Sequence, residues 1–297
     1  MRTIKMTVIN TNVAATITAN ALTKNERAMS QAMERLSTGQ RINSAGDDAA
    51  GLAISSRMTT YIKGLDMAVR NANDAISMIQ TADGALIEMT NMLQRMRELA
   101  VQASSGTYSA TDRDALNVEF EALTAAVEDI ADDTQWNGVS LLNGASAFSF
   151  HVGANASQTI SLTIADFETE ESSMTSGIFE ALADATTNND NSGDDLDSLD
   201  VDTVSNAGTA LTYITTALGR IESHRATLGA TINRLEYAAD NLANGSQNTS
   251  ASRSRILDAD YASETTELAR TQIIQQAATA MLSQANQQAQ SVLALLK

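Results

Sequence analysis

The sequence predicts a mainly α-helical protein, built as a long antiparallel helical bundle or coiled coil with a small β-hairpin region. The 297 residues include about fifty alanines and no proline, a composition that favours uninterrupted helices. Only 4% of the residues are aromatic, so thin, closely packed helices are favoured over a large globular core. Two long stretches also repeat apolar residues in heptads, which is the spacing of a coiled-coil seam.

The first heptad stretch predicts a helix from about Ala53 to Ala100, about 70 Å long at the rise of an α-helix. Its apolar positions step by four and three, shift by three at Ala82 beside Gly84, and then continue. Such a shift is a stammer, at which a coiled coil is locally overwound. The seam consists of Leu65, Val69, Ala72, Ile76, Ile79, Ala82, Leu86, Met89, Leu93, Met96 and Ala100.

The second heptad stretch runs without a break over residues 211–242 and predicts a partner helix for the first. Arg225 is its one charged seam position, and we expect it to fix the register or to reach a carboxylate on the partner helix. A shorter helix is predicted between the two. Its apolar positions are Leu116, Phe120, Leu123, Val127 and Ile130.

Two short alternating runs between the helices predict a β-hairpin. Phe148, Phe150 and Val152 alternate with polar residues, and the same pattern recurs in residues 160–164 after a loop of six residues. Residues 186–202 form an acidic segment, which we expect to be a solvated, mobile surface loop. A calcium loop is disfavoured there, because Gly193 lies too early for the required spacing.

Both ends of the chain predict single amphipathic helices, over residues 11–38 and 264–297. Isolated helices of this kind are marginal in water, so their apolar stripes need each other or other chains. Both ends are therefore predicted to be association surfaces.

Composition also excludes several functions. A net charge of −17, with nineteen acidic and no basic residues in positions 114–219, argues against nucleic-acid binding. No stretch of 18 apolar residues is present, so we expect no membrane insertion. The chain has no cysteine, and its two histidines, His151 and His224, lie outside any zinc-protease motif. With no nucleotide or hydrolase motif either, we expect no enzyme activity, metal or cofactor.

Blocks at both ends of the chain resemble bacterial flagellin. In the N-terminal part they are VINTN at 8–12, ERLSTGQRINSAGDDAAGLAIS at 34–55, IKGL at 62–65, RNANDAISMIQTADGAL at 70–86, LQRMRELAVQA at 93–103 and WNGVSLLNG at 136–144. In the C-terminal part they are LGATINRLEYAADNL at 228–242, SRILDADYASE at 254–264, IIQQA at 273–277 and MLSQANQQAQSVLALLK at 281–297. The blocks are collinear and cover roughly the first 145 and the last 90 residues.

The resemblance implies a short flagellin with two domains. Residues 1–43 and 256–297 would form an inner coiled-coil domain of terminal helices that lines the filament core. Residues 44–169 and 206–255 would form a rod domain of helices and a β-hairpin. Residues 170–205 would be a short, variable acidic insertion.

The resemblance also implies three groups of functional residues. Arg95, Leu99 and Glu119 match positions at which the animal flagellin-sensing Toll-like receptor contacts flagellin and at which subunits meet; spacing alone places Arg95 and Leu99 off the seam, on an exposed face. Gly46, Asp47, Asp48, Asp258 and Asp260 match the domain connector, where we expect a positive φ at Gly46 and a helix cap at Asp47 or Asp48. Filament-core assembly is implied for the terminal stripes, represented by Val13, Ile17, Met29, Met33, Leu36, Ile274, Met281, Val292, Leu293 and Leu296.

The function that the resemblance implies is that of a structural subunit that polymerises into the extracellular flagellar filament for swimming. Export by the flagellar type III apparatus is implied, as are four partners: copies of the same chain in a helical homopolymer, a secretion chaperone, the filament cap with the hook-associated proteins, and the Toll-like receptor. Two alternatives stay open, a hook–filament junction protein and a secreted coiled-coil adhesin.

Overall fold

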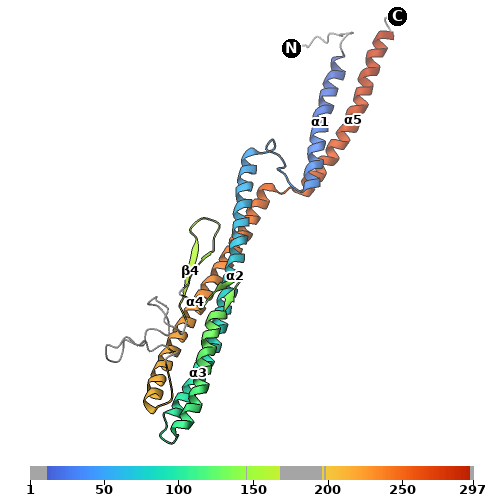
Figure 1. The fold of residues 1–297 in the computed structure, drawn as a ribbon. Coiled ribbons are helices and arrows are strands. Elements are labelled where there is room, and N and C mark those ends of the chain that lie inside the picture. The colour runs from blue at the N-terminus through green and yellow to red at the C-terminus, as the bar shows by residue number, and fades with distance from the viewer. Residues whose placement is uncertain (1–11, 145, 168–195, 197–198, 295–297) are drawn as a thin grey trace. The chain divides into compact units, whose positions relative to one another are not determined.

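The computed structural model describes residues 12–144, 146–167, 196 and 199–294. It is mainly α-helical, as predicted, and the order of its elements can be followed in Figure 1. The helices and strands are α1 (Val13–Thr38), α2 (Ala49–Ala103), α3 (Ala110–Asp133), β1 (Gln135–Trp136), β2 (Val139–Ser140), β3 (Ser146–His151), β4 (Thr159–Ile164), α4 (Val204–Leu257) and α5 (Tyr261–Ala294).

The chain divides into two compact units, and the division falls within the two longest helices. Unit 1 comprises residues 1–60 and 247–297, and therefore holds α1, α5 and the adjoining ends of α2 and α4. Unit 2 comprises residues 61–246, with the rest of α2 and α4, all of α3 and the strands.

The core of unit 2 follows the two predicted seams. Nine of the eleven positions of the first seam are buried in α2, and Val69 and Ile76 are half-buried. In α4 every second seam position from Ile214 to Leu235 is fully buried, at Ile214, Ile221, Leu228 and Leu235. Since α2 and α4 both contribute to one continuous cluster of buried side chains, the predicted pairing of the two helices is confirmed.

The charged seam residue of α4 does reach a carboxylate. Arg225 Nε lies 2.7 Å from Asp83 Oδ1, and both side chains are about two-thirds buried. Hydrogen bonding to Asp83 raises the pKa of Arg225 above its usual range. Asp83 stands next to Ala82, where the heptad of α2 shifts, so this ion pair joins the two helices at the irregular point of the seam.

Helix α3 is the third helix of this core and packs against α2 and α4. Its first turn is closed by a capping box, in which Ser109 and Asp112 satisfy each other's backbone amides. Its buried residues are Phe120, Thr124, Val127 and Ala131. The predicted positions Leu116, Leu123 and Ile130 are half-buried at the edge of the core, so the buried face is rotated slightly from the predicted one.

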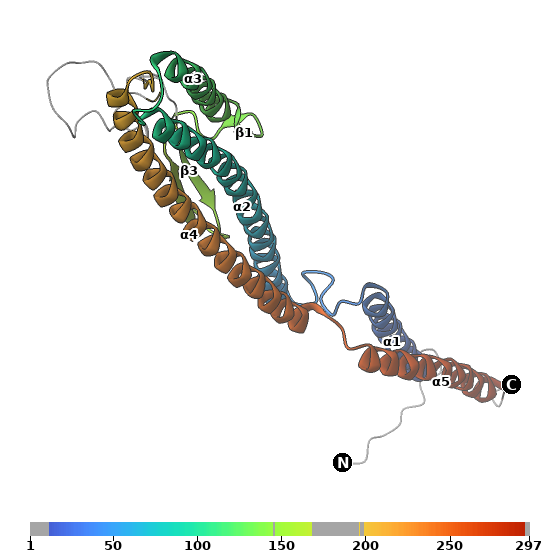
Figure 2. The same cartoon turned by 90° about the horizontal axis from the view of Figure 1, so that it is seen from below.

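The predicted hairpin is confirmed as β3 and β4, which pair antiparallel with Phe148 opposite Leu162 and Phe150 opposite Ile160. Figure 2 shows β3 beside α2 and α4, and Asn71 Nδ2 of α2 donates to the carbonyl of His151 at 3.2 Å. A second hairpin, β1–β2, was not predicted. Its two-residue turn is Asn137-Gly138, with φ of 50° and 79°, and this dipeptide is a strong hairpin signal in its own right.

The acidic segment differs from its prediction where the structure describes it. Leu196, Leu199 and Val201 are buried against the core, and the Val201 amide donates to Asn117 Oδ1 at 2.8 Å. The end of the segment is therefore anchored to α3, since its few apolar side chains have a core within reach. Residues 186–195, 197 and 198 of the segment lie outside the described residues.

Candidate assembly and recognition surfaces

In unit 1 the terminal helices α1 and α5 pack side by side, as Figure 1 shows. Polar contacts hold the pair in register. Asn25 Nδ2 donates to the carbonyl of Thr271 at 2.8 Å in a buried position, and Arg35 pairs with Glu264 at 3.1 Å. Few large apolar side chains are buried between the two helices, so the pair is closed mainly by small and polar residues.

The apolar side chains of the pair are mostly left uncovered. Ile17 is 64% exposed and Met281 is 60% exposed. Val13, Met33 and Ile274 are also exposed, whereas Met29 and Leu36 are half-buried in the pair. The side chains of Val292 and Leu293, and Leu296 altogether, lie outside the described residues.

Sequence reasoning missed one member of this apolar face. Ile273 is 66% exposed, more than the predicted Ile274 beside it. The regular four-and-three spacing selected Ile274, but the pair of adjacent isoleucines signals that both sides of the stripe are apolar. We call the exposed side chains of Val13, Ile17, Met33, Ile273, Ile274 and Met281 the terminal apolar face.

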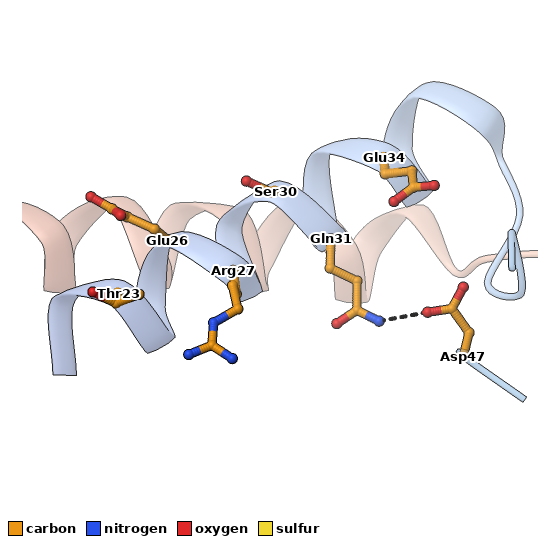
Figure 3. A pocket seen from close by; sticks show the side chains of 7 residues that line it. All are labelled: Thr23, Glu26, Arg27, Ser30, Gln31, Glu34 and Asp47. Atoms are coloured by element: carbon orange, nitrogen blue, oxygen red, sulfur yellow. Dashed lines mark hydrogen bonds between the residues drawn. The ribbon is translucent and has the colours of Figure 1, made fainter. Parts of the chain in front are cut away.

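A polar pocket of about 410 Å³ lies along α1, and Figure 3 shows the side chains that line it. All seven are polar: Thr23, Glu26, Arg27, Ser30, Gln31, Glu34 and Asp47. No apolar residue therefore lines this pocket. A hydrogen bond from Gln31 Nε2 to Asp47 Oδ1 at 2.9 Å, drawn as a dashed line in Figure 3, ties α1 to the loop before α2.

Asp47 and Asp48 organise that loop in different ways. Asp47 accepts hydrogen bonds from the amides of Asn43 and Ser44, and these bonds lower the pKa of the Asp47 carboxyl. Asp48 accepts from the amide of Gly51 at 2.8 Å and so caps α2, as predicted for one of the two residues.

Gly46 does not adopt the positive φ that we expected. The residue with that conformation is Gly39, which ends α1 with φ 71° and donates its amide to the carbonyl of Arg35. The end of α1 is an αL cap, which requires a left-handed residue, whereas the loop that Asp47 closes does not. The sequence signal was the glycine directly after the last heptad residues of α1.

The returning chain meets the outgoing one at Asp258. Gln40 and Asp258 form an antiparallel bridge, flanked by hydrogen bonds from the Arg41 amide to the Leu257 carbonyl and from the Ala259 amide to the Gly39 carbonyl. Asp260 accepts from the amide of Ala262 and caps α5. We call this the connector bridge.

Two of the three predicted recognition residues meet at the surface of unit 2. The guanidinium of Arg95 on α2 lies 2.8 Å from Glu119 on α3 and 3.0 Å from Glu98, and all three side chains are exposed. Hydrogen bonding to Glu119 raises the pKa of Arg95.

Leu99 was predicted to lie on an exposed face, but its side chain is only 1% exposed. Helix α3 packs on α2 at this level, so the heptad seam toward α4 is not the only buried face of α2. The burial of Leu99 follows from this third helix, which a two-helix heptad pattern does not take into account.

No helix in the described part of the chain has the length and apolar content to cross a membrane. A closed helical core in one unit and a helix pair with exposed apolar side chains in the other are typical of a helical structural protein. Comparison with known proteins makes the class specific. The bacterial flagellin N-terminal helical region matches residues 9–147, and the bacterial flagellin C-terminal helical region matches residues 211–296.

Relatives match over nearly the whole chain. Flagellin of Bacillus subtilis (strain 168) is 43% identical, over 97% of this chain and 99% of the relative. Flagellin of Halalkalibacterium halodurans is 44% identical, over 98% and 100%. The chain therefore belongs to the bacterial flagellin family.

A solved structure described as a putative flagellar hook-associated protein from Vibrio parahaemolyticus has a TM-score of 0.57 over 71% of this chain and 100% of that one. At 10% identity this likeness shows the fold alone. Family membership makes the chain a structural subunit of the extracellular flagellar filament, and the family is one of structural proteins rather than enzymes.

Proposed function

We propose that this filament subunit polymerises by coupled folding and association of its terminal helices. The observation that carries the proposal is the terminal apolar face, whose side chains stay exposed although α1 and α5 are already paired. Burying one such side chain completely is worth about 1.5–3 kcal/mol. Two paired helices cover only the sides that face each other, so their outer apolar side chains stay exposed. In a filament core, the helices of neighbouring subunits would bury these side chains.

Deletion of residues 291–297 tests this mechanism. We expect the truncated chain to form no filaments, while its circular dichroism retains the helices of unit 2. Negative-stain electron microscopy after seeding measures assembly. Gln272→Ala, which changes an exposed polar residue of α5, is the matched control and should assemble normally. Ordinary filaments from the truncated chain would contradict the proposal.

A second test follows α1 and α5 by hydrogen exchange. In the monomer their amides are expected to exchange much faster than those of α2 around Leu86 and Met89, which lie in the closed core. In filaments the exchange of α1 and α5 should slow to the level of α2. Equal protection in monomer and filament would refute coupled folding.

The domain assignment is part of the same proposal. We assign residues 1–43 and 256–297 to the inner domain, 44–169 and 206–255 to the rod, and 170–205 to the variable insertion. The connector residues Asp47, Asp48, Asp258 and Asp260, whose hydrogen bonds are described above, lie close in the sequence to the two proposed boundaries, after residues 43 and 255. Limited proteolysis of monomers tests the assignment, which requires early cleavage in the inner domain and a persistent rod fragment.

Export by the flagellar type III apparatus and protection by a secretion chaperone are proposed for the unassembled chain. Zero cysteines and zero prolines support passage as an unfolded chain, since neither a disulfide nor slow prolyl isomerisation can interfere. The apolar stripe of α5 is the surface that a chaperone would cover, and the filament cap and hook-associated proteins would be its neighbours after export. Copurification from cells should recover a chaperone with the full chain and lose it on deletion of residues 291–297.

Recognition of the monomer by the animal flagellin-sensing Toll-like receptor is proposed for the surface around Arg95 and Glu119. Arginine is enriched among interface hot spots, and Arg95 is exposed in a fixed position between Glu98 and Glu119. In a reporter-cell assay, Arg95→Ala monomers should lose potency, whereas Arg234→Ala, at another exposed arginine of unit 2, should keep it. Full potency of Arg95→Ala would contradict the proposal.

Leu99→Ala needs a separate folding control, because its side chain is buried and its loss leaves a cavity in the core.

The hook–filament junction role is the rival function within the flagellum, and a secreted adhesin is the rival outside it. Purified protein that forms long tubes after seeding fits a filament subunit and excludes both.

A further inference from the structure

The chain contains three Asn-Gly dipeptides, at Asn137-Gly138, Asn143-Gly144 and Asn244-Gly245. An asparagine before glycine can lose its side-chain amide without any enzyme. The glycine amide nitrogen attacks the asparagine Cγ, a carbon–nitrogen bond forms, and ammonia leaves, giving a five-membered succinimide. Water then opens this ring to aspartate or isoaspartate, so the balance is one water consumed and one ammonia released.

This reaction requires a glycine amide that is free to move toward the asparagine side chain. A backbone amide already held in a hydrogen bond must first be released, which costs the free energy of local opening. The three dipeptides share the same pair of residues, so the fold decides which of them reacts.

Two of the three dipeptides are held. Asn244 and Gly245 lie inside α4, whose backbone is fixed by helical hydrogen bonds. Asn143 Nδ2 donates to Asp132 Oδ1 at 2.7 Å, and the Gly144 amide donates to Asp166 Oδ1 at 3.1 Å. Both the electrophile and the nucleophile of Asn143-Gly144 are therefore engaged.

Asn137-Gly138 is not held in this way. The dipeptide forms the exposed turn between β1 and β2, and no heavy atom lies within 4 Å of where a Gly138 side chain would begin. Within the described part of the chain, no hydrogen bond engages the Asn137 side chain or the Gly138 amide. We propose that Asn137 is the site at which the folded protein spontaneously deamidates and forms isoaspartate.

The modification has a local structural consequence. Isoaspartate inserts an extra methylene into the main chain of a two-residue turn, whose register places Trp136 opposite Val139. The longer turn cannot keep this register, and the new carboxylate adds a negative charge. Trp136, the only tryptophan of the chain, packs against the core beside the turn, so its fluorescence reports the change.

The experiment follows all three asparagines in one sample of folded full-length protein, aged at mildly alkaline pH in ¹⁸O-labelled water. Peptide mapping by mass spectrometry, with electron-transfer fragmentation to recognise isoaspartate, gives the extent of conversion at each site. The label marks residues converted during the incubation. We expect Asn137 to convert at least about tenfold faster than Asn143 and Asn244. A parallel sample in strong denaturant should convert all three at similar rates.

Trp136 fluorescence separates the two products. Asn137→Asp reproduces the charge of deamidation with a normal main chain and should keep the fluorescence of the fresh protein. Aged protein rich in isoaspartate should differ from it. The proposal is overturned if Asn143 or Asn244 converts as fast as Asn137 in the folded chain. It is also overturned if Asn137 stays intact while the denatured sample reacts.

Discussion

Units 1 and 2 are built from helices of similar composition, yet they bury their apolar side chains to very different degrees. In unit 2 the helices α2 and α4 are joined by α3 and by the β3–β4 hairpin, and together they enclose one continuous core. In unit 1 the helices α1 and α5 have only each other, and side chains such as Ile17 and Met281 stay exposed. The two units thus differ because α3 and the hairpin add a third layer that closes the core of unit 2, and not because their helix propensities differ. Unit 1 lacks such a layer and needs further chains to cover its apolar side chains.

The largest effect is expected from a cavity in the closed core. Phe120→Ala removes a fully buried ring of α3 and should lower the free energy of unfolding of unit 2 by about 3–5 kcal/mol. Met33→Ala, on the terminal apolar face, should change the stability of the monomer by less than about 0.5 kcal/mol but weaken filament assembly. Denaturant unfolding of monomers and sedimentation of filaments measure the two effects. Equal loss of monomer stability in both variants would remove the distinction between the units.

A smaller effect is expected inside the terminal pair. Asn25→Ala deletes the buried hydrogen bond to the Thr271 carbonyl and should destabilise the contact between α1 and α5 by about 1 kcal/mol. Hydrogen exchange should become faster in both helices and remain unchanged in α2 beyond residue 61. Asn20→Ala changes an exposed asparagine of the same helix and serves as the control. Unchanged exchange in Asn25→Ala would show that the pair does not depend on this bond.

The Asp83–Arg225 ion pair should contribute still less, because both side chains keep about a third of their exposure. We expect a coupling energy of about 0.5–1 kcal/mol from a double-mutant cycle of Asp83→Asn and Arg225→Gln, measured by denaturant unfolding in low salt. High salt should reduce it. A coupling energy of zero would mean that apolar packing alone fixes the register of α2 and α4.

The smallest effect is a pH dependence of unit 2. His224 packs against the ring of Phe167 with its Nε2 buried and unbonded, and burial lowers the pKa of this histidine below its ordinary value of 6.5. Between the folded and the unfolded pKa the unfolded chain binds more protons, so stability falls as the pH falls below about 6.5. His224→Leu should flatten this part of the dependence of the melting temperature on pH. The exposed His151→Gln should not, and an unchanged slope in His224→Leu would reject the assignment.

The sequence was sufficient to predict the helices, the two seams and the β3–β4 hairpin, because each depends on a repeat that is visible within one segment. Even the role of Arg225 could be predicted, since a charge in an apolar seam requires a partner nearby.

Features that depend on a third element could not be predicted in the same way. The burial of Leu99 and of Leu196 requires knowledge of which helix or segment lies across from α2 and α3. We expected the left-handed residue at Gly46 in the loop, although Gly39, which directly follows α1, carries the sequence signal of a helix end. The exposed receptor and connector residues were proposed from family resemblance, since spacing alone describes them equally well as solvated surface.

The connector bridge is made by main-chain atoms: the Arg41 and Ala259 amides donate, and the Leu257 and Gly39 carbonyls accept. Its main-chain pairing does not depend on the side chains at positions 40 and 259, whereas the guanidinium of Arg41 adds a hydrogen bond to the Ile256 carbonyl at 2.7 Å. Proline lacks an amide proton and therefore cannot make the main-chain bond at position 41 or 259. In a saturation library screened for motility, positions 40 and 259 should accept most substitutions, and positions 41 and 259 should reject proline.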